Sequence, residues 1–319
     1  MTIFKYYKLH KVSKYLKIIK RGTSIMVTHF HKKPNLYTSH VQLKVSNLER
    51  SIEFYTTIIG FQLLEQTATT AYLTVDGKTS LISLIEVQEA VSQQGFTGLY
   101  HFALLLPTRK DLGNIIQHFI QTNTRLGAAD HDVSEALYLN DPDGNGIEIY
   151  IDRPENEWTW NRDGQVHMVT EQLNFQAILA EADGTWSGLP EGTIIGHMHL
   201  SVSDLAQTAA FYTNVLDFNI VCEYGGQALF ISTGNYHHHI GFNTWQSAGR
   251  PALPENAVGL KSFTIVLKDE TYAQTVKENL QAAGAIVEQY EEAPTYGGKQ
   301  LFSTIDPSGI RLIFTIEGE

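Results

Sequence analysis

The sequence predicts an α+β protein in which four βαβββ modules pair into two cupped mixed β-sheets, with the helices outside. Two observations predict this fold class. The chain contains an internal repeat, and each copy shows the same order of strand and helix patterns. The composition agrees, because 43% of the 319 residues are hydrophobic and 18% are charged, as in ordinary globular proteins. This length is sufficient for two domains.

The repeat is clearest between residues 39–64 and residues 196–221, which align with one constant offset. In that alignment His40 takes the place of His197. A weaker match relates two further pairs of segments, 98–106 with 259–267 and 139–150 with 304–314. The chain is therefore predicted to contain two kinds of module in the order A-B-A-B, at about 36–94, 97–153, 193–247 and 257–317.

Each module is predicted to begin with a strand and continue with a helix. In the first module, apolar Val41, Leu43 and Val45 alternate with polar residues, so they lie on one face of a strand. Apolar residues then recur at helical spacing from Leu48 to Ile59, which predicts a helix lying on the sheet. Ser46, and Ser203 in the third module, are expected to be the N-caps of these helices. Short alternating strands with Gly and Asp turns complete each module.

The predicted domain organisation has four parts: a basic extension (1–33), a first domain of two modules (34–153), a linker (154–192) and a second domain of two modules (193–319). Residues 1–25 contain seven Lys or Arg and no acidic residue, so the extension is expected to be disordered or not native, with translation starting at Met26. The linker is long for a compact domain, and it allows modules to pair out of sequence order.

Charge and cysteine content exclude several classes of function. The formal net charge of −11 argues against nucleic acid or an anionic membrane surface as a partner. No stretch approaches the roughly 18 uninterrupted apolar residues of a membrane span. Cys222 is the single cysteine, which excludes an internal disulfide and agrees with a reducing cytoplasm. Exposed edges of cupped sheets are suited to forming a homo-oligomer.

A histidine and a glutamate in the second module have the pattern of metal ligands. His101 lies in its first strand and Glu148 in its last strand. Two imidazoles and one carboxylate form a facial triad that leaves positions open for substrate and dioxygen. The third ligand should come from the first strand of a partner A module, where both His40 and His197 qualify.

The fourth module has no equivalent ligands. Ser262 takes the place of His101, and Ile313 or Arg311 takes that of Glu148. The sequence therefore predicts one metal site per chain.

The openings of the A modules and the closing strand DPDGNGIE resemble the vicinal-oxygen-chelate superfamily, which includes glyoxalase I, bleomycin-resistance proteins and type I extradiol dioxygenases. The resemblance covers about residues 36–317. Within this superfamily the chain is similar to two-domain catechol 2,3-dioxygenase-like proteins. Four segments carry that similarity: TGLYHFALLLP (97–107), DHDVSEALYLNDPDGNGIEIY (130–150), IGHMHLSVSDL (195–205) and YHHHIGFNTW (236–245).

The resemblance implies a cytoplasmic, Fe(II)-dependent extradiol dioxygenase of aromatic degradation, acting on a small catechol-like substrate and O2. Manganese, zinc and nickel are alternative metals. Besides the triad, such enzymes carry a catalytic histidine from the ligand-donating A module, and a histidine and a tyrosine from the B module. Carried over by position, these residues are His238 or His239, His131 and Tyr138.

The two candidates for the third ligand imply different pairings of the modules. Modules two and three together hold the complete set, which favours His197. Pairing of modules adjacent in sequence is the simpler topology, and it favours His40. Three consecutive histidines alternate in direction, so either His237 and His239 or His238 alone should face the cup.

Two other functions are compatible with these features. A glyoxalase-type isomerase or a lyase would use zinc or nickel with a further carboxylate, for which Glu86 is the donor in the first module. A non-catalytic resistance protein would bind an aromatic drug in the cup, but such binders usually lack the triad. The cluster of histidines favours the dioxygenase over the isomerase.

Overall fold

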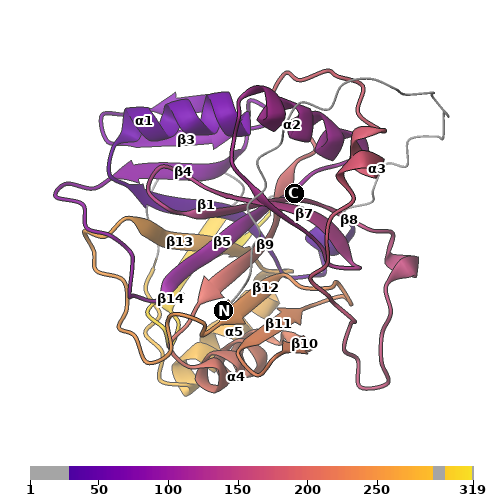
Figure 1. Cartoon of the computed structure of the whole chain (residues 1–319). Helices are drawn as coiled ribbons and strands as arrows, with labels where there is room; N and C mark the ends of the chain where they lie inside the picture. Colours follow the sequence, from indigo (N-terminus) through magenta and orange to yellow (C-terminus); the bar gives the residue numbers. More distant parts are fainter. Residues whose placement is uncertain (1–28, 290–298, 318–319) are drawn as a thin grey trace.

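The computed structural model describes residues 29–289 and 299–317 and has the predicted α+β architecture, with two curled mixed sheets (Figure 1). Most of the expected basic extension, including Met26, lies outside the described residues. No helix in the described ranges is long and apolar enough to cross a membrane.

The first two modules follow the predicted order of strand, helix and strands. The first consists of β1 (Tyr37–Val45), α1 (Leu48–Glu53), a π-helical turn η2 (Phe54–Ile59), β2 (Gln62–Gln66), β3 (Thr70–Thr74) and β4 (Ser80–Glu86). The second consists of β5 (Gly98–Leu105), α2 (Arg109–Gln121), β6 (Gly127–Asp130), β7 (Ser134–Asn140) and β8 (Gly146–Asp152).

The last two modules repeat this order, and short helical turns lie outside the modules. The third consists of β9 (Ile194–Ser201), α4 (Leu205–Leu216), β10 (Asn219–Tyr224), β11 (Ala228–Ser232) and β12 (Ile240–Asn243). The fourth consists of β13 (Gly259–Val266), α5 (Glu270–Ala282), β14 (Lys299–Ile305) and β15 (Arg311–Ile316). Its described residues form two strands after the helix, where three were expected. The remaining elements are η1 (His29–His31), η3 (Glu155–Glu157) and α3 (Phe175–Leu179).

Each sheet combines one module from each half of the chain. The seven-stranded sheet has the order β14-β15-β13-β1-β4-β3-β2, and the eight-stranded sheet has the order β10-β11-β12-β9-β5-β8-β7-β6. At their centres β1 pairs antiparallel with β13, and β5 pairs antiparallel with β9. The sheets therefore do not coincide with the contiguous halves 34–153 and 193–319, since modules one and four form one sheet and modules two and three form the other.

The helices begin one residue later than expected. The N-cap of α1 is Asn47, whose side chain accepts a hydrogen bond from the Arg50 N–H at 2.8 Å. Asp204 caps α4 in the same way through the Gln207 N–H, also at 2.8 Å. The prediction of Ser46 and Ser203 as N-caps was wrong, because either of two adjacent polar residues can supply the capping oxygen.

The apolar core joins the two sheets and their helices. Alternate residues of the central strands, such as Leu43 of β1, Met198 of β9 and Phe263 of β13, are fully buried in one continuous cluster. Strand β1 also contacts β9 of the other sheet, and β13 contacts β5. In Figure 1, α1 and α2 lie at one end of the molecule and α4 and α5 at the other. The face of the eight-stranded sheet that points away from α2 and α4 is therefore available for polar side chains.

Candidate metal centre and its cavity

Three neighbouring strands of the eight-stranded sheet bring two histidines and a glutamate together. Ala103 on the central strand β5 pairs with His197 on β9 and with Glu148 on β8. His101 lies two residues before Ala103, so alternation puts both side chains on the same face. The methyl group of Ala103 is small, which leaves room above it for the longer side chains to converge.

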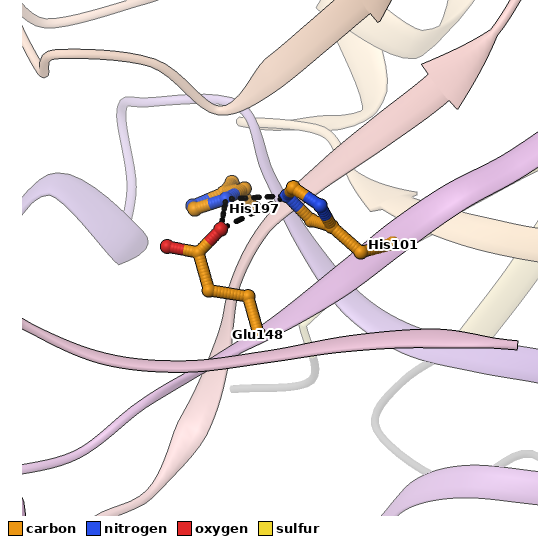
Figure 2. Close-up of side chains that lie close together, drawn as sticks. All are labelled: His101, Glu148 and His197. Atoms are coloured by element: carbon orange, nitrogen blue, oxygen red, sulfur yellow. Dashed lines mark hydrogen bonds and ion pairs between the residues drawn. The ribbon is translucent and has the colours of Figure 1, made fainter. Parts of the chain in front are cut away.

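The ligand atoms of this group lie within 4.8 Å of one another (Figure 2). Glu148 Oε2 is 2.9 Å from His101 Nε2 and 3.2 Å from His197 Nε2, and the two Nε2 atoms are 3.4 Å apart. All three side chains are buried, with Glu148 only 3% exposed. This set of two imidazole nitrogens and one carboxylate oxygen suits a divalent metal.

The pKa shifts of Glu148 and His197 also fit metal binding. Burial tends to raise the pKa of Glu148, but the imidazoles of His197 and His101 outweigh burial and hold that pKa well below its usual value. Burial lowers the pKa of His197. Ionised carboxylate and neutral imidazole are the forms that bind metals.

The rival ligand and the extra carboxylate lie in the other sheet. His40 is on β1, where its Nε2 is 3.5 Å from the hydroxyl of Ser80. Glu86, at the end of β4, accepts a hydrogen bond from the Leu48 N–H at 2.7 Å and so stabilises the start of α1. The structure therefore places His197, and not His40, beside His101 and Glu148.

A cavity of about 490 Å³ opens onto this group. Its lining is largely aromatic and histidine-rich, and includes Tyr100, His131, Tyr138, His199, Phe230, His238 and Trp245 together with the three clustered residues. A cavity of this size, with aromatic walls and a few convergent polar groups, is typical of a small-molecule site.

His131 and Tyr138 form a pair at the wall of the cavity. His131 Nδ1 is 2.5 Å from the carbonyl oxygen of Val169, which can only accept, so this nitrogen carries the proton. His131 Nε2 is 2.6 Å from the hydroxyl oxygen of Tyr138, which completes a hydrogen-bonded pair. Burial, with the nearby charge of Glu148, raises the pKa of Tyr138 well above its usual value, so its hydroxyl stays protonated at neutral pH.

The three consecutive histidines precede β12 and point in alternate directions. His238 lines the cavity, with its ring centroid 4.1 Å from that of His197. His239 faces away, and its Nε2 donates to the carbonyl oxygen of Phe30 at 3.1 Å. His237 also faces away, toward Asp152. Of the two histidines predicted from the resemblance, the structure places His238 at the cavity and His239 behind it, because neighbouring residues of an extended chain face opposite sides.

Sequence reasoning missed His199. It lies on β9 opposite His101, and its buried Nε2 has no hydrogen-bond partner within the described part of the chain. Alternation along β9 could have found it, because His199 follows His197 by two residues and shares its face.

Gly196, the residue before His197, was also missed. A Cβ atom added to Gly196 would lie 2.0 Å from the Tyr150 hydroxyl oxygen. The missing side chain lets the ring of Tyr150 pack against His197, with ring centroids 4.9 Å apart.

Known proteins resemble the chain along most of its length. The model of the Glyoxalase/Bleomycin resistance protein/Dioxygenase superfamily matches residues 38–149 and 194–314. The catechol-2,3-dioxygenase of Bacillus subtilis (strain 168) is 44% identical over 295 residues, which cover 91% of this chain and 100% of that protein. Biphenyl-2,3-diol 1,2-dioxygenase 3 of Rhodococcus globerulus is 25% identical over 166 residues, covering 49% of this chain and 85% of that protein.

A solved structure has the same fold. The crystal structure of a proposed dioxygenase from Bacillus subtilis subsp. subtilis str. 168 aligns with a TM-score of 0.61 at 15% identity, covering 90% of this chain and 87% of that chain.

Proposed function

Because this chain belongs to the glyoxalase, bleomycin resistance protein and dioxygenase superfamily, we propose that it is an Fe(II)-dependent extradiol dioxygenase that cleaves catechol-like aromatic diols beside the diol. The observation that carries the proposal is the convergence of His101, Glu148 and His197 at a cavity that His131, Tyr138 and His238 also line. The substrates would be a small aromatic diol and O2.

In this proposal His101, Glu148 and His197 hold the metal. Their Nε2 and Oε2 atoms already point toward one another, so little reorganisation is needed on binding. Ferrous iron, when bound, supplies a redox-active Lewis acid with open positions for small oxygen ligands.

Aromatic side chains of the cavity would hold the substrate ring. Tyr100, Phe230 and Trp245 form walls around His199, with the rings of Tyr100 and Trp245 5.1 Å apart. Such walls bind a flat ring through apolar contact and exclude water from the reacting atoms.

His238 would accept a proton from the diol, and Tyr138 would hydrogen-bond one of the diol oxygens. Burial, together with the surrounding histidines, lowers the pKa of His238 well below its usual value, so its imidazole is neutral and can accept a hydroxyl proton. The Tyr138 hydroxyl, already aligned with His131, would hydrogen-bond a ring oxygen through the ring-opening steps.

The test is anaerobic purification, metal analysis, and addition of catechol in air while a yellow ring-fission product is followed by absorbance. Glu148→Ala should lower metal affinity at least about 100-fold and abolish turnover, because a buried ligand is lost. His197→Ala should behave in the same way.

His40→Ala is the matched control, since it removes a buried histidine at the equivalent position of the other sheet. It should retain both iron and activity. Zinc or nickel without oxygen consumption would instead support the isomerase or lyase, and full activity of Glu148→Ala would refute the assignment.

A further inference from the structure

Behind His238, on the side away from the cavity, a chain of buried polar groups leads to a carboxylate. Asp152 Oδ1 is 2.7 Å from His237 Nε2 and 3.1 Å from the hydroxyl of Tyr236. The Tyr236 hydroxyl is in turn 2.7 Å from that of Tyr150. On its other side, His237 Nδ1 is 2.8 Å from His238 Nδ1. Within residues 29–289 and 299–317, the hydrogen bonds of Asp152 and His237 lead to the cavity only through His238.

The hydrogen-bonding partners restrict where the protons can lie along this chain. An ionised carboxylate can only accept, so His237 Nε2 carries a proton and donates it to Asp152. When His237 carries only this proton, its lone pair is on Nδ1, and the 2.8 Å contact then requires His238 Nδ1 to donate. In that arrangement His238 is protonated at Nδ1, and its lone pair is on Nε2.

The burial of Asp152 indicates that this hydrogen-bonded arrangement serves a function beyond packing. Its side chain is 4% exposed and that of His237 is fully buried. A buried carboxylate is costly unless hydrogen bonds compensate for its lost hydration, and here a histidine and a tyrosine supply them. An apolar pair would fill the same space without this cost.

We infer that Asp152 and His237 are positioning residues that hold His238 in the tautomer whose Nε2 is unprotonated and available as a base. The arrangement is related to the triad of serine proteases, in which a buried carboxylate holds the histidine that acts as the base in the correct tautomer, but here one additional imidazole lies between carboxylate and base. The role of His238 as the base rests on the proposed function, but its tautomer does not.

The tautomer can be measured on the metal-free full chain by nitrogen-15 NMR of labelled histidine. The His238 signals are assigned by comparison with the spectrum of His238→Gln. The expected result is an unprotonated Nε2 and a protonated Nδ1. A protonated Nε2 in the unmodified protein would overturn the inference, whatever reaction the protein catalyses.

Two substitutions of His237 separate positioning from simple packing. His237→Phe keeps a ring but removes both nitrogens, so we expect the tautomer preference of His238 to be lost and kcat to fall about 100-fold, with KM and metal affinity within about threefold. In His237→Gln the amide can donate to Asp152 and accept from His238. Compared with His237→Phe, this variant should therefore regain most of the turnover and the tautomer preference of His238.

His118→Gln is the matched control, because His118 is a buried histidine of α2 that bonds the carbonyl groups of Thr57 and Ile58. Its kcat should stay within about twofold of the unmodified protein. Equal turnover in His237→Phe and the unmodified protein would overturn the inference. If the unmodified iron-loaded protein cleaves no catechol, the proposed function fails, and the tautomer measurement still decides the inference. The same measurement decides it if His237→Phe does not fold.

Discussion

Ala103 lies at the centre of the strand positions that supply the candidate metal ligands, although it carries no ligand atom. It pairs with His197 on one side and with Glu148 on the other, and it shares a face with His101. The three longer side chains therefore start from positions next to Ala103 on one face of the sheet. A larger side chain at this position would occupy the space in which the ligand atoms meet.

Asp306 lies in the turn before β15, and its burial makes the stability of the protein depend on pH. It is 4% exposed, and burial raises its pKa to about 6, although the N–H groups of Ile310 and Ser308 donate to it and act in the opposite direction. In an unfolded chain the pKa of an aspartate is about 3.9. Because the folded pKa is the higher one, the stability from the protonated carboxyl is fully present below about pH 4 and is lost as the pH rises through about 6.

We expect the free energy of unfolding of the unmodified protein to fall by about 1 kcal/mol relative to Asp306→Asn between about pH 5 and about pH 7.5. The asparagine keeps an oxygen that can accept the two backbone N–H groups, but it carries no charge. Urea unfolding followed by circular dichroism at several pH values measures the difference. A difference that stays constant, or that changes in the opposite direction, contradicts the prediction.

At the level of elements, each A module is hydrogen-bonded to the B module that follows it in sequence. In both cases a tyrosine hydroxyl from the helical segment of the A module donates to an aspartate in a turn of the B module. The Tyr55 hydroxyl, from η2, donates to Asp141 at 3.1 Å, and the Tyr212 hydroxyl, from α4, donates to Asp306 at 3.2 Å. All four residues are buried. These bonds hold together modules one and two, and modules three and four, although the members of each pair belong to different sheets.

Tyr55→Phe and Tyr212→Phe should each lower the free energy of unfolding by about 1–3 kcal/mol, because a buried carboxyl loses a donor and no water replaces it. Tyr224→Phe is the control, since Tyr224 is 41% exposed and should change stability by less than about 0.5 kcal/mol. Urea unfolding of the three variants gives the comparison. Equal effects in all three would show that the tyrosine hydroxyls do not stabilise the fold.

The internal repeat made most of these elements predictable. Residues at equivalent positions, such as Tyr55 and Tyr212 or His40 and His197, do take equivalent places in the structure. The side of the chain to which each of the three histidines points could not be predicted, because His237–His239 lie outside a strand and their phase depends on the neighbouring turn. The N-caps were missed by one residue for a similar reason, since capping depends on local backbone angles.

At the scale of the whole molecule, the pairing of modules was left open by the sequence. The first strands of all four modules have similar alternating patterns, and backbone hydrogen bonds between strand edges do not distinguish one partner from another. The choice depends on packing across the entire core, including β1 against β9. Local patterns carry no information on that packing, whereas the completeness of the ligand set in modules two and three did favour the pairing found.

This pairing predicts that neither contiguous half binds the metal alone. His101 and Glu148 lie in residues 34–153, and His197 lies in residues 193–319. Each half expressed separately should bind Fe(II) or Zn(II) at least about 100-fold more weakly than the full chain. Mixing the halves during refolding should restore binding, as measured by titration calorimetry.

The control is a full chain cleaved at a protease site introduced into the exposed turn 161–164, which should keep its affinity. Tight binding by residues 34–153 alone would mean that His40 can replace His197, and it would contradict the pairing of modules two and three as the origin of the site.

The separation of β5 and β9 along the chain also matters while the protein is being synthesised. His101 and His197 are 96 residues apart, so at about 5–20 residues per second the ribosome needs roughly 5–20 s to deliver the second strand after the first. During that interval the edge of β5 that pairs with β9 has no native neighbour in the nascent chain, although β8 can already pair with the other edge. The corresponding edge of β1 remains unpaired still longer, until β13 is made. The exposed edges are then open to pairing with other chains, and occupancy of the metal centre can begin only late in translation.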